Sequence, residues 1–217
     1  MRNKKEETID RLAYEKQYYE QGYQYIAGCD EAGRGPIAGP LVVAAVIFPQ
    51  GYYDERINDS KKLSEKKREE LYDIIIENAL AYYITVYDEK KVDELNVYTG
   101  SKTGMINCID HLTIKPDFTL TDAMPLDDAH PHLAIIKGDS KSMTIGAASI
   151  LAKVTRDRMM YEYDKIYPEY NFKQHKGYPT KAHLEALEKY GACPIHRLSF
   201  GPVKNLKQKQ LSFDFDE

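Results

Sequence analysis

The segment 41–48 (Leu-Val-Val-Ala-Ala-Val-Ile-Phe) is a run of eight consecutive apolar residues that ends at Pro49. Its length suits a strand, and its β-branched content favours one. A strand that is apolar at every position is buried on both faces, unlike an edge strand with alternating polar residues. The run therefore predicts a central strand of a sheet that is covered on both sides.

Strand-like and helix-like segments alternate on either side of this run. Ser64 and Thr180 are typical N-caps, and Gly191 is a typical helix end. The pattern predicts helices over 8–21, 65–81, 99–112, 146–163 and 181–190, and further strands over 23–29, 82–87, 117–122 and 133–139. Such alternation indicates an α/β fold with a mixed sheet.

Size and composition set broad limits on function. A chain of 217 residues suits one compact domain. The net charge is −4, yet residues 137–210 carry 14 Lys or Arg against 7 Asp or Glu, which permits a basic face toward phosphate. Apolar runs stay below the roughly 20 residues of a membrane span, and the N-terminus lacks the apolar core of a signal peptide. We therefore expect a cytoplasmic protein with no membrane partner.

Three cysteines, Cys29, Cys108 and Cys193, lie far apart in the chain and form no Cys-x-x-Cys pair. Neither a zinc site nor a disulfide framework is indicated by this spacing. We expect reduced thiols, of the kind commonly buried in protein cores.

Acidic residues close three of the predicted strands: Asp30 with Glu31, then Asp122, then Asp139. Asp30 and Glu31 are adjacent, so they can share one site only if their strand ends there. Four carboxylates at strand ends would suit two Mg²⁺ ions, which prefer hard oxygen ligands. Taken by themselves, the same acids could equally be strand-end caps or solvated residues.

Several blocks of sequence carry a more specific signal. The first is Gly28–Pro36 (GCDEAGRGP), and the others are 58–64, 93–96, 137–140, 147–157, 175–180 and 196–202. Together, in this order, they closely resemble the ribonuclease HII family of the bacterial type. The resemblance implies an RNase H-like mixed β-sheet flanked by helices, with a helical C-terminal portion. It divides the chain into an N-terminal helical segment (1–22), a catalytic domain (23–205) and a C-terminal tail (206–217).

The resemblance also implies an activity. Family members hydrolyse RNA in RNA–DNA hybrids and incise 5′ of single ribonucleotides in duplex DNA, leaving 5′-phosphate and 3′-hydroxyl ends. The metal-binding and catalytic acids carry over to Asp30, Glu31, Asp122 and Asp139, which would hold two Mg²⁺ or Mn²⁺ ions. Rival interpretations are a ribonuclease HIII, a resolvase-like nuclease on the same fold, and a non-catalytic hybrid-binding module tethered to a sliding clamp.

Substrate contacts carry over in the same way. The Gly33-Arg34-Gly35 turn corresponds to the segment that contacts the ribose 2′-hydroxyl, and Tyr178 to the tyrosine that packs on a sugar at the ribonucleotide–deoxyribonucleotide junction. Bare glycines suit this role because backbone groups can approach a hydroxyl closely there. Lys61 lies where a phosphate contact would be useful.

Other residues have less certain roles. Ala123 stands where the family often has glycine, which narrows the backbone choices after Asp122. Arg197 is a candidate phosphate contact or a solvated residue. His175 and His196 are either proton carriers or phosphate ligands, or hydrogen-bonded structural histidines.

The sequence also supports expectations for Asp157, for the C-terminal segment and for the oligomeric state. Asp157 is expected to form a structural ion pair or cap. The segment Gln210–Phe215 (QLSFDF) resembles peptides that dock on bacterial sliding clamps. The alternative is a tail whose aromatic residues pack on their own domain. We expect a monomer that lacks the extra N-terminal domain of some family members.

Overall fold

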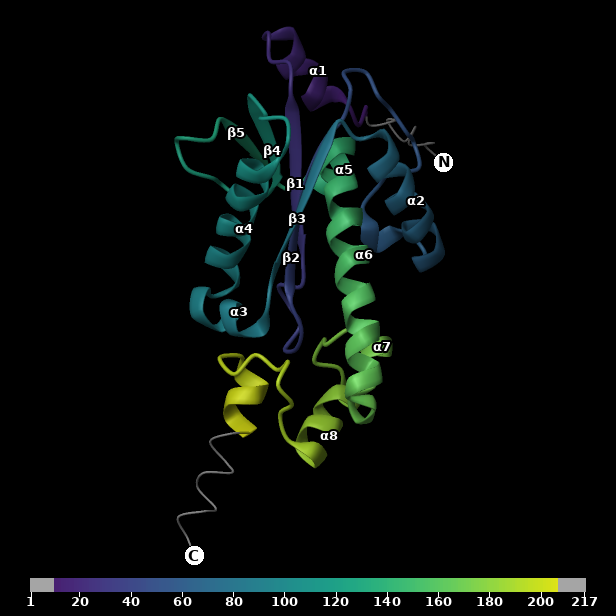
Figure 1. Cartoon of the computed structure of the whole chain (residues 1–217), viewed down its shortest axis with the longest axis vertical. Coiled ribbons are helices and arrows are strands. Elements are labelled where there is room, and N and C mark those ends of the chain that lie inside the picture. The colour runs from purple at the N-terminus through teal and green to yellow at the C-terminus, as the bar shows by residue number, and fades with distance from the viewer. Residues whose placement is uncertain (1–9, 207–217) are drawn as a thin grey trace, which may run out of the picture.

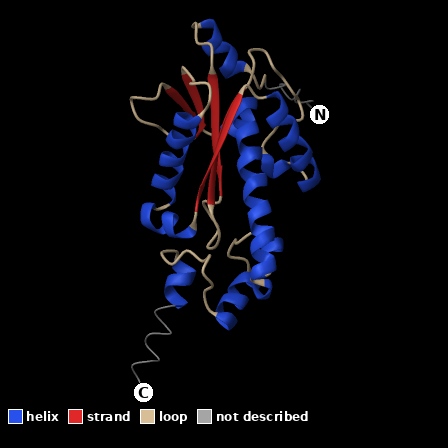
Figure 2. Ribbon diagram, viewed as in Figure 1, coloured by secondary structure: helices blue, strands red, loops and turns tan. Residues whose placement is uncertain are grey.

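The computed structural model describes residues 10–206, and in this range one mixed sheet lies between two layers of helices (Figure 1, Figure 2). The strands are β1 (Ile26–Ala32), β2 (Leu41–Ile47), β3 (Ala81–Tyr87), β4 (Phe118–Asp122) and β5 (His132–Ile135). Their order is β3-β2-β1-β4-β5. The pairs β3–β2 and β2–β1 are antiparallel, whereas β1–β4 and β4–β5 are parallel. The predicted mixed α/β sheet is confirmed.

Helices flank this sheet, and several of the shorter ones gather at the C-terminal end of the fold (Figure 1). They are α1 (Ala13–Glu20), α2 (Glu65–Asn78), α3 (Glu89–Leu95), α4 (Val97–His111), α5 (Gly138–Lys141), α6 (Met143–Ile166), α7 (Phe172–His175) and α8 (Lys181–Tyr190). Helix α4 packs on one face of the sheet, and α6 with α2 on the other. Among residues 10–206, no helix is long and apolar enough to cross a membrane.

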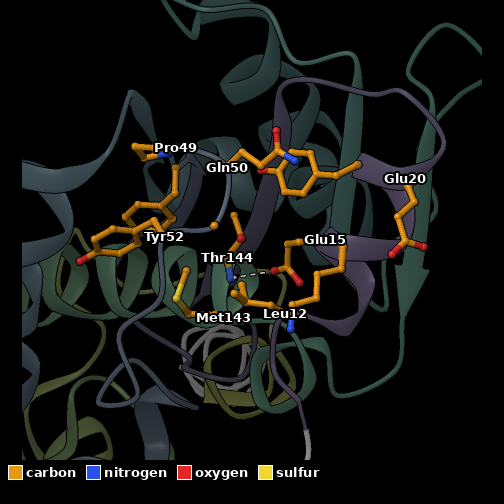
Figure 3. Close-up of a pocket in the computed structure, with 12 residues that line it drawn as sticks. Leu12, Glu15, Glu20, Pro49, Gln50, Tyr52, Met143 and Thr144 are labelled. Atoms are coloured by element: carbon orange, nitrogen blue, oxygen red, sulfur yellow. Dashed lines mark hydrogen bonds between the residues drawn. The ribbon is translucent and has the colours of Figure 1, made fainter.

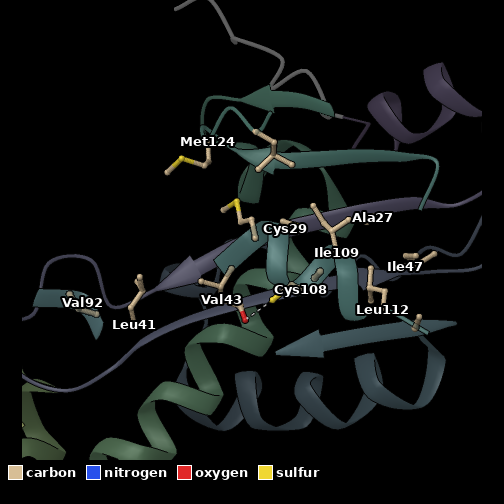
Figure 4. Packing of buried hydrophobic residues seen from close by; sticks show 14 residues of the cluster. Ala27, Cys29, Leu41, Val43, Ile47, Val92, Cys108, Ile109, Leu112 and Met124 are labelled. Carbon is tan, nitrogen blue, oxygen red and sulfur yellow. Dashed lines mark hydrogen bonds between the residues drawn. The ribbon is translucent and has the colours of Figure 1, made fainter. Parts of the chain in front are cut away.

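The apolar run does form a central strand that is buried on both faces. Every residue of β2 is fully buried, and its side chains enter two different core clusters. On the α4 face, Cys108 donates a hydrogen bond from Sγ to the Val43 carbonyl at 3.4 Å (Figure 4). Helix α4 lies close to β2 at this point because residue 104 is a glycine. A Cβ on Gly104 would lie only 2.6 Å from Val43 Cγ2. Cys29 and Cys108 are buried free thiols, as expected.

Two predicted strand ends are wrong, and both bear on the site. Strand β1 continues to Ala32, so Asp30 and Glu31 lie inside a paired strand and not beyond its end. Strand β5 stops at Ile135, and Asp139 lies in the first turn of α5. A left-handed residue, Lys137 (φ 57°), ends the extended chain and begins this helical turn.

Most helix limits differ from the prediction by a few residues, because caps outside the apolar pattern decide them. The Asn96 side chain accepts hydrogen bonds from the first amides of α4, and Ser142 does the same for α6. Helix α3 was not predicted, since its short polar sequence shows no apolar period; Asp88 caps it. Helix α8 matches its prediction, with Thr180 as its N-cap.

Candidate active site

A cleft of about 250 Å³ opens beside the C-terminal half of β1. The predicted site residues gather in its wall: Asp30, Glu31, Gly33, Arg34, Gly35, Lys61, Asp122 and Tyr178 line it directly. Asp139 lies next to it, because its Oδ2 is 3.4 Å from the Nζ of Lys61. The cleft therefore unites segments that are far apart in the sequence.

Three carboxylates form a compact cluster. Asp30, Asp122 and Asp139 each offer an oxygen, and these oxygens lie within 4.8 Å of one another. The parallel register that pairs Cys29 with Thr121 places the following residues, Asp30 and Asp122, side by side. The Gly138 amide donates to Asp122 Oδ1 at 2.7 Å and so joins the end of β4 to the turn that carries Asp139.

The electrostatics of this cluster suit a cation. Burial, followed by the charges of Glu31 and Asp122, raises the pKa of Asp30 well above its ordinary value. Burial also raises the pKa of Asp122, although the Gly138 amide opposes the rise. Carboxylates crowded in this way repel one another unless a cation lies between them. Their oxygen donors fit Mg²⁺ or Mn²⁺.

Glu31 lies at the edge of this cluster. Asp30 and Glu31 both line the cleft although they are adjacent in a paired strand, so sharing the cleft does not require the strand to end there. Glu31 Oε1 accepts from Arg34 Nη1 at 3.2 Å, and Oε2 is buried without a hydrogen-bond partner in the described part of the chain. Burial raises the pKa of Glu31, while Arg34 opposes that rise. The orphaned oxygen leaves Glu31 free to accept a further donor or a cation.

The glycine turn and Tyr178 are in contact. Gly33 has φ +106°, a conformation that favours glycine, and an added Cβ would lie 2.5 Å from Arg156 Nε. A Cβ on Gly35 would lie 3.2 Å from Tyr178 Cε1, so the tyrosine ring packs over the bare backbone. Tyr178 is 45% exposed, which leaves part of the ring open to a ligand.

Two buried arginines hold the loop that follows this turn. Arg156 donates to the carbonyls of Ala38 (3.1 Å), Pro40 (2.9 Å) and Lys176 (2.9 Å), and so links the loop to the turn before Tyr178. Burial lowers the pKa of Arg156 to about 10. The sequence reasoning missed this role, because an arginine among charged residues of a helix is normally exposed.

Arg197 belongs to the same arrangement. It is fully buried and donates to the carbonyls of Gly39 (2.9 Å) and Pro36 (2.8 Å). Its candidate role as a phosphate contact is therefore wrong: its guanidinium is directed at the protein backbone and not at solvent.

The histidines are structural in this geometry. His183 Nδ1 donates to the Tyr178 carbonyl at 2.9 Å, so His183 Nε2 accepts from His196 Nε2 at 3.1 Å. His196 Nδ1 then accepts from the Cys193 amide at 3.0 Å. His175 is also buried and donates from Nε2 to the Tyr170 carbonyl. The structural interpretation of His175 and His196 is favoured over contact with phosphate.

Asp157 and Lys61 differ in their surroundings. Asp157 is buried and forms ion pairs with Lys153 at 2.6 Å and Arg68 at 3.7 Å, as predicted. Lys61 reaches the acidic cluster on a largely exposed side chain. Burial would lower the pKa of Lys61, but the charges of Asp139 and neighbouring acids raise it.

The mixed sheet between helices, with an acidic cluster beside β1 and β4, matches the class of ribonuclease H-like enzymes that the sequence resemblance predicts. A family model described as Ribonuclease HII matches residues 27–203. The chain belongs to the ribonuclease HII family and is a ribonuclease H enzyme, whose activity is directed at RNA–DNA hybrids.

Individual relatives agree with this assignment. The chain is 54% identical to a ribonuclease HII of Acholeplasma laidlawii over 93% of this chain and 100% of the relative, and 52% identical to that of Listeria innocua over 92% and 76%. Ribonuclease H2 from Pyrococcus horikoshii has a similar structure, with a TM-score of 0.74, 28% identity, and coverage of 85% and 98%. A PCNA:RNase HII complex from Archaeoglobus fulgidus matches with a TM-score of 0.70, 26% identity, and coverage of 82% and 95%.

Proposed function

We propose that this enzyme is an endonuclease that cleaves the RNA strand of hybrids and also incises 5′ of a single ribonucleotide in duplex DNA. The observation that carries the proposal is the shared cleft: the acidic cluster around Asp30 and the contact between Gly35 and Tyr178 line one cavity. Chemistry and recognition of the sugar can therefore act on the same nucleotide.

Asp30, Glu31, Asp122 and Asp139 are the proposed ligands of two divalent ions, Mg²⁺ or Mn²⁺. When bound, such ions supply an activated water and stabilise the leaving oxygen. Asp30, Asp122 and Asp139 form the compact ligand set, and the orphaned Oε2 of Glu31 is the further oxygen donor at its edge. Lys61 is placed to meet a phosphate that approaches this charge. Products would carry 5′-phosphate and 3′-hydroxyl ends.

Recognition of the ribonucleotide is assigned to the glycine turn and the tyrosine. The backbone of Gly33, Arg34 and Gly35 can reach a 2′-hydroxyl, since no side chain intervenes at the glycines. The exposed part of the Tyr178 ring offers an apolar surface to the next sugar, which favours a deoxyribose without a hydroxyl. The glycine turn and Tyr178 together would recognise the junction between a ribonucleotide and a deoxyribonucleotide.

The decisive experiment uses a DNA duplex that contains one ribonucleotide, with Mg²⁺ or Mn²⁺. We expect one incision, 5′ of the ribonucleotide, and its loss in Asp139→Asn. Substitution of Tyr178 by Ala should reduce junction cleavage while metal binding is retained. Equal cutting of an all-DNA duplex, or an active Asp139→Asn variant, would refute the proposal.

We also propose a protein partner, an oligomeric state and a location for this enzyme. One structural neighbour is a complex with PCNA, and the segment Gln210–Phe215 is our candidate for a sliding-clamp contact, although it lies outside the described residues. Deletion of 210–217 should abolish capture by the clamp. We propose a monomer that acts in the cytoplasm.

A further inference from the structure

Two charged side chains on the N-terminal side of the fold are buried although they lie near its surface: Arg11 in the turn before α1, and Glu15 in α1 itself. Arg11 is 8% exposed and Glu15 is 2% exposed. Both precede residue 27, where the match to the family model begins. Buried charges are costly unless they have specific partners, so their contacts call for an explanation.

Arg11 binds the backbone of the segment that carries Asp139. Its Nη2 donates to the Asp139 carbonyl at 2.8 Å and to the Ser142 carbonyl at 3.3 Å, and Nη1 donates to the Ile57 carbonyl. Its own carbonyl accepts from the Met143 amide at 2.8 Å. The last carbonyls of a helix lack partners within the helix, and Arg11 provides one for the Asp139 carbonyl of the four-residue helix α5.

Glu15 binds the other side of the same junction. Its Oε1 accepts from Ser142 Oγ at 2.6 Å and from the Thr144 amide at 3.1 Å, at the start of α6 (Figure 3). A carboxylate is favoured at a helix N-terminus, where amides lack partners. Glu15 and Thr144 also line a cavity of about 320 Å³, together with aromatic residues such as Phe48 and Tyr52. No residue in the wall of this cavity lines the acidic cleft.

We propose that Arg11 and Glu15 are positioning residues that set the affinity of the acidic cluster for divalent metal. They fix the α5–α6 junction from both sides, and α5, the helix that carries Asp139, is only one turn long. The inference rests on the proposed role of Asp139 as a metal ligand. Residues that orient metal ligands typically change metal affinity by about 10- to 100-fold when they are replaced.

The test measures Mn²⁺ binding to the full metal-free chain, without nucleic acid, from the electron paramagnetic resonance signal of free Mn²⁺. We expect Arg11→Met and Glu15→Ala to weaken binding by about 10-fold or more. Arg11→Lys, which retains the charge and one donor group, should restore part of the affinity. Lys16→Ala is the matched control on the same helix, because Lys16 is exposed and pairs only with Asp10 in the described structure.

A second control separates positioning from general stability. Leu71→Ala removes a buried side chain of α2 and should lower Tm without changing Mn²⁺ affinity. If Arg11→Met fails to fold, Arg11→Lys and Glu15→Ala decide the matter. Wild-type Mn²⁺ affinity in folded variants would overturn the inference, provided that Asp139→Asn loses binding. Unchanged binding in Asp139→Asn would instead overturn the proposed metal site itself.

Discussion

The ring of Tyr178 lies against the backbone of Gly35, so closely that a Cβ at residue 35 would be 3.2 Å from Tyr178 Cε1. The turn after β1 and the turn before α8 therefore form one continuous surface. Arg156 joins the two turns from beneath, because it donates to carbonyl groups on both sides.

The contact predicts the effect of one added methyl group. Gly35→Ala should displace the Tyr178 ring and reduce incision at a single ribonucleotide at least about 10-fold, while a long RNA–DNA hybrid is affected less. Steady-state cleavage of the two substrates measures this. Gly201→Ala is the control, because a Cβ there meets nothing within 4 Å. An equal loss on both substrates would contradict the assignment of this contact to junction recognition.

Replacement of Arg156 tests the loop beneath the glycine turn. Arg156→Met leaves the buried carbonyls of Ala38 and Pro40, and the part-buried carbonyl of Lys176, without their donor. We expect a loss of at least about 3 kcal/mol in the free energy of unfolding, since each buried unpaired group costs about 1–3 kcal/mol. Urea denaturation measures it. Arg158→Met, two residues along the same helix, removes an exposed pair with Glu69 and the contact of its guanidinium with the Tyr72 ring, and should cost only about 1 kcal/mol.

The buried histidines predict a dependence of stability on pH. Burial lowers the pKa of His183 and of His196 to about 4, from 6.5. Between these values the unfolded chain binds more protons than the folded protein, so stability is fully present above pH 6.5 and is lost as the pH falls toward 4. His196→Gln keeps a donor toward His183 but does not titrate. Its Tm should vary less steeply with pH than that of the wild type; an unchanged slope would contradict the explanation.

The acidic cluster predicts a conflict between stability and metal binding. Burial and the charges of Glu31 and Asp122 raise the pKa of Asp30, so ionisation of Asp30 destabilises the metal-free fold as the pH rises above its unfolded value of 3.8. Asp30→Asn should therefore raise Tm at neutral pH without metal. Mn²⁺ should stabilise the wild type by mass action and the variant much less. Thermal melts with and without Mn²⁺ give both values.

Ala123 predicts a stabilising substitution. It has φ 52°, a left-handed conformation that costs an L-residue about 1–2 kcal/mol. Ala123→Gly removes this strain but adds entropy to the unfolded chain, and we expect a net gain of about 0.5–1 kcal/mol. Chemical denaturation provides the measurement, and a lower stability of the glycine variant would show that the strain is relieved elsewhere.

The elements that sequence predicted well are those with local signals. Helix α8 has a threonine cap and a glycine end, and β2 has an unbroken apolar run. The strand limits near Asp30 and Asp139 could not be predicted in this way. Strand β1 is extended by pairing with β2, and Asp139 is placed by a helical turn that Arg11 holds from a distant segment.

In the candidate site, too, some features could be predicted from the sequence and others depend on the tertiary structure. The resemblance identified the residues that line the cleft, but residue types alone left the acids open between a metal site and solvated caps. Arg156 and Arg197 were beyond prediction as buried residues, because their partners are backbone carbonyls that only the folded loop brings together. Charge in a sequence indicates exposure; its burial is decided by the tertiary structure.

Because β1 pairs with the distant strand β4, the acidic residues of the cleft emerge from the ribosome at different times during translation. Asp30 leaves the ribosome long before Asp122 and Asp139, because β1 and its antiparallel partner β2 are neighbours in the chain, whereas β4 follows much later. The segment that holds Arg11 is made earlier still, and its acceptor at Asp139 comes late. A nascent chain with only its first half exposed therefore lacks Asp122 and Asp139, two of the four proposed metal ligands.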